Sequence, residues 1–257
     1  AGSVPFPGGF RLPPHADGTL PLPLDVPAKG KCFVNICYHC KQDSALIKAD
    51  HLLGFDEIPL QNSDPRNQDA VQLLGRPAGD GLITIRETDR MLVLSCEQFT
   101  YVFNKLTGLF DKMTFANEPL LDQPMGFNVW RAPTDNDRKL KADWYAAHYD
   151  HAATNAYHTE YTVTASGVTL HTHVGIAAIC VQKFLDLDVT WTVANNGSVD
   201  LALHAQRNTV FPELPRFGLR LFLPQEMSQV NYYGMGPMEC YCDKHHAASH
   251  NSYTATV

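Results

Sequence analysis

The feature that most constrains this chain is a series of short strand-like runs between Met91 and Tyr233. The runs are rich in β-branched and aromatic residues, which fit the pleated surface of a sheet. Turn-forming pairs such as Ser166-Gly167 and Asn196-Gly197 separate many of them. The predicted strands are 91–96, 99–104, 109–115, 157–165, 168–176, 180–194, 201–210, 217–223 and 230–233. The pattern predicts an all-β, antiparallel domain.

Two segments depart from this pattern. Leu140, Trp144 and His148 recur at four-residue spacing, which predicts one helix over residues 139–149. Asn196-Gly197-Ser198 satisfies the glycosylation sequon, yet Asn-Gly between two strand-like runs is also the strongest short hairpin signal. The hairpin turn is the favoured interpretation of this tripeptide.

The N-terminal part of the chain predicts a few strands of a separate domain. Leucines alternate with prolines at 20–24, which predicts an edge strand because proline cannot donate a ladder hydrogen bond. Residues 32–38 and 51–60 are two further strand-like runs. Three strands cannot close a sandwich, so they are interpreted as the end of one. The polar residues 61–81 have the composition of a linker.

Composition argues against several classes of partner. The chain carries 20 basic and 27 acidic side chains, a net charge of −7. It therefore lacks the positive electrostatic field that attracts nucleic acid and anionic lipid surfaces. No run reaches the roughly 18 to 20 apolar residues of a membrane-spanning helix. The start lacks a signal-peptide pattern, and the seven cysteines, an odd number, do not form a dense disulfide framework. We therefore expect no nucleic acid, no membrane and a cytoplasmic location.

Several groups of residues have metal-ligand chemistry without a convincing metal-ligand arrangement. Cys37 and Cys40 continue a strand, in which residues three apart point to opposite faces. His171 and His173 share a strand face but are only two ligands. The stronger cluster is Cys240, Cys242, His245 and His246. We predict no metal site, and metal binding by this last cluster stays open.

The densest polar segment is Trp130-Arg131-Ala132-Pro133-Thr134-Asp135-Asn136-Asp137. Arg131 can form a bidentate ion pair with Asp135 or Asp137 while the Asx side chains cap backbone amides, which would order the loop. An aromatic residue and Asx side chains also suit a loop that borders a sugar site. Common nucleophile and nucleotide-binding signatures do not occur, and sequence alone cannot place a pair of carboxylates at the roughly 5 to 10 Å that glycoside cleavage needs.

At this octet the sequence resembles the β-galactosidases of glycoside hydrolase family two. Three further segments support the resemblance in the family's order: FTYVFNKLTGLF at 99–110, LPRFGLRLFLP at 214–224 and VNYYGMGPMECYCDK at 230–244. The early segment 30–60 resembles the end of the family's immunoglobulin-like domain. The resemblance covers most of the chain.

The resemblance implies an all-β chain in which the C-terminal part of an immunoglobulin-like sandwich (1–62) and a linker (63–81) precede an antiparallel β-supersandwich of galactose-mutarotase-like type (82–257). It also implies that this chain is the non-catalytic C-terminal portion of a β-galactosidase, with no catalytic residue and no cofactor of its own. The implied partners are the catalytic barrel, which holds magnesium and sodium, a β-galactoside or galactose, and further copies of the parent in a homo-oligomer.

The resemblance also assigns residues. Asp135, Asn136 and Asp137 are expected at the substrate-site border. The family's motif positions are expected to be structural, and in this chain they are Trp130, Arg131, Arg216, Gly218, Gly236, Pro237, Glu239 and Asp243.

Departures from the family pattern leave some questions open. Residues 138–140 read Arg-Lys-Leu where the family commonly has glycine, which puts a glycine-hinged loop motion in doubt. Cys240 replaces a usual asparagine, and Lys244 replaces a usual arginine. The alternatives are a free-standing sugar-binding or aldose-1-epimerase-like protein, with His204 and Glu213 as base and acid, and a plain interaction module.

Overall fold

The computed structural model describes residues 12–26, 31–61, 81–241 and 243–257. The chain divides into two compact units, Ala1–Asp69 with Val230–Val257, and Ala70–Gln229. The linker predicted at 63–81 lies almost wholly outside the described residues, so the predicted domain boundaries stay a prediction. The described residues are predominantly strands in antiparallel sheets, which confirms the predicted all-β class.

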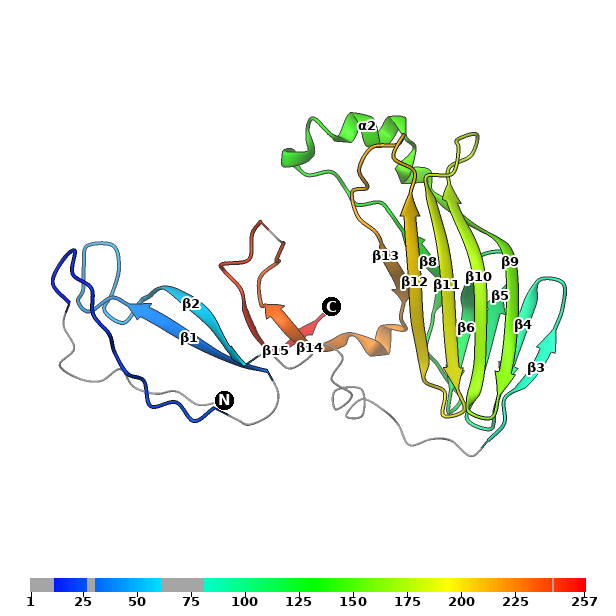
Figure 1. The fold of residues 1–257 in the computed structure, drawn as a ribbon, viewed down its shortest axis with the longest axis horizontal. Helices are drawn as coiled ribbons and strands as arrows, with labels where there is room; N and C mark the ends of the chain where they lie inside the picture. The colour runs from blue at the N-terminus through cyan, green and yellow to red at the C-terminus, as the bar shows by residue number, and fades with distance from the viewer. Residues whose placement is uncertain (1–11, 27–30, 62–80, 242) are drawn as a thin grey trace. The chain divides into compact units, whose positions relative to one another are not determined.

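The larger unit contains two antiparallel sheets that lie face to face (Figure 1). One sheet has the order β3-β4-β5-β6-β7, and the other has the order β12-β11-β10-β9. The first sheet consists of β3 (Thr84–Glu87), β4 (Met91–Ser95), β5 (Phe99–Asn104), β6 (Leu109–Phe115) and β7 (Glu118–Pro119). The second consists of β9 (Ala153–Thr164), β10 (Gly167–Ala177), β11 (Leu185–Ala194) and β12 (Val199–Arg207). A separate pair joins β8 (Gln123–Asn128) to β13 (Gly218–Phe222).

The core forms because alternate side chains on the facing strands point between the two sheets. In β11 every second residue from Leu185 to Val193 is buried, and the residues between them are more exposed. Trp191, 2% exposed, meets Phe110 edge to face with ring centroids 5.2 Å apart. Its indole nitrogen donates a 3.0 Å hydrogen bond to the carbonyl of Gly108, so the aromatic ring is buried with its polar atom satisfied.

Two glycines in tight turns have backbone conformations that other residues adopt at a cost. Gly108 has a φ of 72° and Gly197 a φ of 83°. Gly197 belongs to the hairpin turn between β11 and β12, where its N–H donates 2.9 Å to the carbonyl of Ala194. The Asn196-Gly197 turn prediction is therefore confirmed, although the connection is longer than a two-residue hairpin.

Among the described residues, helix is confined to short segments. The predicted helix at 139–149 is shorter than expected: α2 is Lys141–Ala146, and a 3-10 turn, Tyr149–His151, follows it. His148 has a φ of 55°, a left-handed conformation that cannot continue a right-handed helix. Other 3-10 turns are Asp135–Asp137 and Gln225–Met227. In the part of the chain that the structure describes, no helix is long and apolar enough to cross a membrane.

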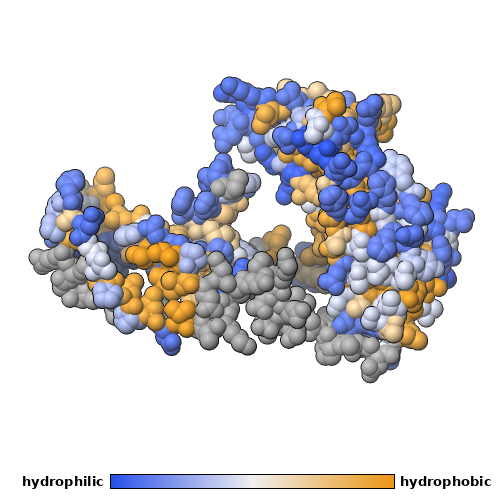
Figure 2. Space-filling model, viewed as in Figure 1, coloured by the Kyte–Doolittle hydropathy of each residue, from blue (hydrophilic) through white to orange (hydrophobic). Residues whose placement is uncertain are grey.

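The smaller unit contains two hairpins, β1 (Cys32–His39) with β2 (Leu52–Gln61), and β14 (Gln229–Gly236) with β15 (Ser249–Thr256). His250 of β15 stacks on Phe33 at 4.3 Å, and its Nδ1 lies 2.6 Å from the carboxylate of Glu57, so the two hairpins are held together. Hydrophobic atoms are visible over the β1–β2 hairpin in Figure 2. Leu53 of β2 is 60% exposed.

The predicted edge strand at 20–24 is wrong. Residues 12–26 contain no strand, and their prolines at alternate positions leave too few N–H donors for a ladder.

Candidate functional site

The loop that carries the WRAPTDND octet is ordered by an ion pair. The guanidinium of Arg131 donates two hydrogen bonds to Asp137, at 2.5 and 2.8 Å. The backbone N–H and the hydroxyl of Thr134 donate to the same carboxylate at 2.8 and 3.0 Å. The Asp137 side chain is 8% exposed, and these four donors, Arg131 foremost, hold its pKa well below the usual aspartate value. The predicted ion pair is confirmed, with Asp137 rather than Asp135 as its acceptor.

A second loop, between β12 and β13, is tied to the first by hydrogen bonds to its backbone carbonyls. Arg131 Nε donates to the carbonyl of Pro215 at 3.2 Å, and the Trp144 indole donates to that of Glu213 at 3.0 Å. The buried Tyr149 hydroxyl donates to the carbonyl of Pro212 at 2.6 Å. The Arg131 guanidinium also lies 5.1 Å from the centre of the Trp144 ring. The two loops therefore form one ordered platform.

A hollow of about 460 Å³ opens beside this platform. Its lining combines the octet with the start of β13: Asn128, Trp130, Arg131, Ala132, Arg216, Phe217, Gly218, Leu219 and Arg220. Arginines dominate the polar lining, and no carboxylate is among these residues. The hollow is in the size range of small-ligand sites, and its arginines favour an anionic or strongly hydrogen-bonding occupant.

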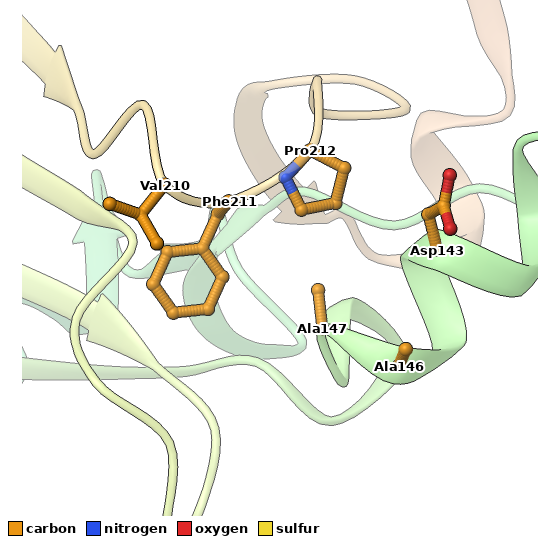
Figure 3. Close-up of a pocket in the computed structure, with 6 residues that line it drawn as sticks. All are labelled: Asp143, Ala146, Ala147, Val210, Phe211 and Pro212. Carbon is orange, nitrogen blue, oxygen red and sulfur yellow. The ribbon is translucent and has the colours of Figure 1, made fainter.

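A second hollow, about 470 Å³, lies on the same platform (Figure 3). Figure 3 shows that α2 and the residue after it supply Asp143, Ala146 and Ala147, and the loop after β12 supplies Val210, Phe211 and Pro212. Asp143 is its single carboxylate. The lining is mostly apolar and open, so it offers little to orient a sugar.

The structure brings some of the predicted residues together. Trp130, Arg131, Arg216 and Gly218 all line the arginine-rich hollow. Asp135 and Asn136 are exposed on the 3-10 turn of the octet loop, whereas Asp137 is buried below them. The predicted border residues thus divide into two exposed side chains and one structural one.

The other predicted structural residues, Gly236, Pro237, Glu239 and Asp243, belong to the smaller unit. The carbonyl of Gly236 accepts a 2.8 Å hydrogen bond from the hydroxyl of Tyr253, and a Cβ at Gly236 would clash with the Tyr232 hydroxyl. Glu239 accepts a 2.8 Å hydrogen bond from Tyr241. Gly236 is therefore required for close packing between β14 and β15.

The candidate metal ligands have other contacts. His173 lies between Asp186 and Asp188, at 3.1 and 3.0 Å, and His171 lies 3.1 Å from the Thr190 hydroxyl. Cys242 lies outside the described residues, and the rings of His245 and His246 stack on each other. Across the described ranges, no group of three or more His, Cys, Asp or Glu side chains is placed to hold a metal ion.

The proposed acid–base pair of the alternative hypothesis has separate surroundings. Glu213, in the loop after β12, accepts a 2.6 Å hydrogen bond from Arg207, the last residue of β12. His204 lies within β12, opposite Asp188 in the ladder with β11. Glu213 is therefore engaged by an arginine and not by His204.

Asn128 and Arg220 were not predicted as site residues from the sequence. A usable signal was present, because Arg216, Gly218 and Arg220 follow one another at two-residue spacing. In an extended chain that spacing places both arginines on one face with a glycine between them.

Comparisons with known proteins agree with the resemblance. A family model described as the β-galactosidase small chain matches residues 95–257. The β-galactosidase of Actinobacillus pleuropneumoniae is 32% identical over 244 residues, which cover 95% of this chain and 24% of that protein. The β-galactosidase of Staphylococcus xylosus is 30% identical over 245 residues, with coverage of 95% and 24%. The chain spans about a quarter of the length of these relatives. The chain belongs to the β-galactosidase small-chain family.

Proposed function

We propose that this chain is the non-catalytic C-terminal portion of a β-galactosidase, which hydrolyses terminal β-galactosides such as lactose. Its role is to shape the rim of an active site whose acid/base and nucleophile belong to the catalytic part of the enzyme. The relatives that it matches are β-galactosidases about four times its length, which leaves room for such a part.

The observation that carries the proposal is the architecture of the octet loop. Arg131 pairs with the buried Asp137, and Asp135 and Asn136 are exposed on the turn that this pair orders. Their acceptor and donor groups suit the hydroxyls of a sugar, and a turn fixed from beneath positions them at low entropic cost.

The lining of the two hollows supports a role without chemistry. Glycoside cleavage uses two carboxylates that flank the bond at about 5 to 10 Å. The arginine-rich hollow is lined by none, and the hollow of Figure 3 is lined by Asp143 alone.

Further parts of the proposal follow from the family. Residues 82–257 would be the mutarotase-like sandwich, and residues 1–62 would be the end of an immunoglobulin-like domain. The parent enzyme would be a cytoplasmic homo-oligomer that holds magnesium and sodium in its catalytic barrel, with no cofactor bound by this chain.

A proton NMR time course of the purified chain with lactose and freshly dissolved α-galactose tests the proposal. The proposal predicts that lactose cleavage and anomer exchange both stay at the rate of the buffer blank, while circular dichroism shows a folded β protein. Accelerated anomer exchange would instead support an epimerase-like protein, and lactose cleavage would show that the chain has its own catalytic carboxylates.

A further inference from the structure

One face of the β8–β13 ladder carries two half-buried glycines with open space above them. Gly218 pairs with Asn128, and Arg220 pairs with Gly126, so these four residues share a face. Leu219 and Phe127 form the intervening pair and pack on the core from the opposite face. We call the outward face of Gly126, Asn128, Gly218 and Arg220 the glycine floor.

The two glycines of this floor are not explained by the fold. A Cβ added at Gly126 or at Gly218 would meet nothing within 4 Å. Neither glycine has the positive φ that is found at Gly108 and Gly197. Glycine weakens a strand interior, and it is typical of sites where a ligand or another backbone approaches closely. The space above the floor is therefore best explained by an occupant that is not among the described residues.

The charged side chains beside the glycine floor indicate which kind of occupant it favours. Arg216 and Arg220 are exposed at the two sides of Gly218, and within the described residues neither forms a salt bridge. Arg220 instead lies 4.8 Å from the ring of Phe222. Asp137 of the neighbouring octet loop is already bound by Arg131. In a chain of net charge −7, a hollow that is lined by arginines and by no carboxylate favours an anionic occupant.

We infer that the glycine floor binds an extended, carboxylate-bearing polypeptide segment from the part of the enzyme that lies outside this chain. The backbone of that segment would lie over Gly126 and Gly218, and its carboxylates would pair with Arg216 and Arg220. This inference rests on the proposed function, since the relatives are about four times as long as this chain and so have further polypeptide to supply the segment.

The test is a titration of the full chain with three probes. Calorimetry measures the binding, and amide NMR shows which residues are affected. The probes are a capped Gly-Asp-Gly-Asp-Gly peptide, the matching Gly-Asn-Gly-Asn-Gly peptide, and sodium acetate at equal carboxylate concentration. We expect the acidic peptide to shift the amide signals of Gly218 and Asn128 and to bind at least about tenfold tighter than the other probes. Its binding should weaken with added salt.

Variants separate the floor from the arginines. Gly218→Val should weaken binding of the acidic peptide at least about tenfold by blocking close approach, without loss of stability, because the added Cβ enters open space. Gly54→Val is the matched control, since Gly54 is also a strand glycine with nothing within 4 Å. A double change, Arg216→Gln with Arg220→Gln, should abolish the preference for the acidic peptide, whereas exposed Arg90→Gln should not.

Equal binding of the acidic and amide peptides, or no binding of either, would overturn the inference. So would tight binding that Gly218→Val leaves unchanged. Acetate that binds as tightly as the peptide would show a free-anion site instead of a docking surface. These outcomes do not depend on enzyme activity, so the proposed function can fail while the peptide still binds, and the peptide can fail to bind while the chain still supports hydrolysis.

Discussion

Arg131 and Asp137 lie six residues apart and are joined by two parallel hydrogen bonds of 2.5 and 2.8 Å. The same arginine donates to the carbonyl of Pro215, 84 residues further along the chain. One side chain therefore sets the conformation of the octet loop and attaches it to the loop before β13. Because both exposed border residues lie on this loop, its order is the structural basis of the proposed rim.

Arg131→Ala should lower the midpoint of thermal unfolding by about 5 °C or more, because a carboxylate that is 8% exposed loses its partner. The matched control is Arg138→Ala, an exposed arginine of the same segment. Differential scanning calorimetry measures both variants. An unchanged midpoint for Arg131→Ala would refute the structural role of the pair.

The same pair predicts a pH dependence. The folded state holds the pKa of Asp137 below the ordinary value of 3.8, with Arg131 as the main cause, so the folded state favours the ionised carboxylate. Its stabilisation is complete above the ordinary aspartate pKa and is lost as the pH falls toward the lower folded value. The stability difference between the wild type and Asp137→Asn should be constant from pH 7 to pH 5 and should shrink at about pH 3. Urea unfolding at these pH values, with Asp135→Asn as the control, checks the prediction; a difference that grows at low pH would contradict it.

Tyr149 gives a second test of the platform. Its hydroxyl is the donor to the carbonyl of Pro212, and burial raises the pKa of this phenol because the charged form is poorly solvated. Tyr149→Phe should cost about 1 kcal/mol of unfolding free energy, since a carbonyl loses its partner at little change in volume. Tyr145→Phe, at a tyrosine that is 47% exposed, is the control and should be neutral. Equal denaturation midpoints for both variants would argue against a platform held by Tyr149.

The turn at Gly197 predicts a contrast between two glycines. Gly197→Ala should destabilise by about 1 to 2 kcal/mol, because φ is 83° and the added Cβ approaches Phe115 at 2.9 Å. Gly126→Ala should lie within about 0.5 kcal/mol of the wild type, since its Cβ enters open space in an ordinary strand conformation. Guanidinium titration of both variants measures the contrast. Equal effects of the two substitutions would contradict the left-handed backbone conformation of Gly197.

The sequence predicted some elements to the residue because their signals are local. The β5 and β6 strands match the expected 99–104 and 109–115, where β-branched and aromatic runs flank the Thr107-Gly108 turn. By contrast, β8 was missed, since its QPMGFN sequence contains proline and glycine and its partner strand is about 90 residues away. The predicted helix was too long, because the end of the helix depends on the backbone conformation of His148. The spacing of apolar residues does not encode that conformation.

The candidate site was predicted in the same uneven way. The octet supplied Arg131 and two aspartates as alternative acceptors, and only the fold selects Asp137, because Thr134 adds two donors to that carboxylate. The hollow unites the octet with β13, a contact between distant segments that no local pattern reveals. Arg220 was therefore missed although it lies in a segment that carried the resemblance.

The most direct test of the account is a chimera in which this chain replaces the matching quarter of the Actinobacillus pleuropneumoniae β-galactosidase. Hydrolysis of lactose is compared with that of the enzyme truncated before this region and with that of the chain alone. The account predicts that the chimera hydrolyses lactose, that both separate parts do not, and that Arg131→Ala in the chimera lowers the rate. A folded chimera no more active than the truncated enzyme, or a chain that hydrolyses lactose by itself, would contradict it.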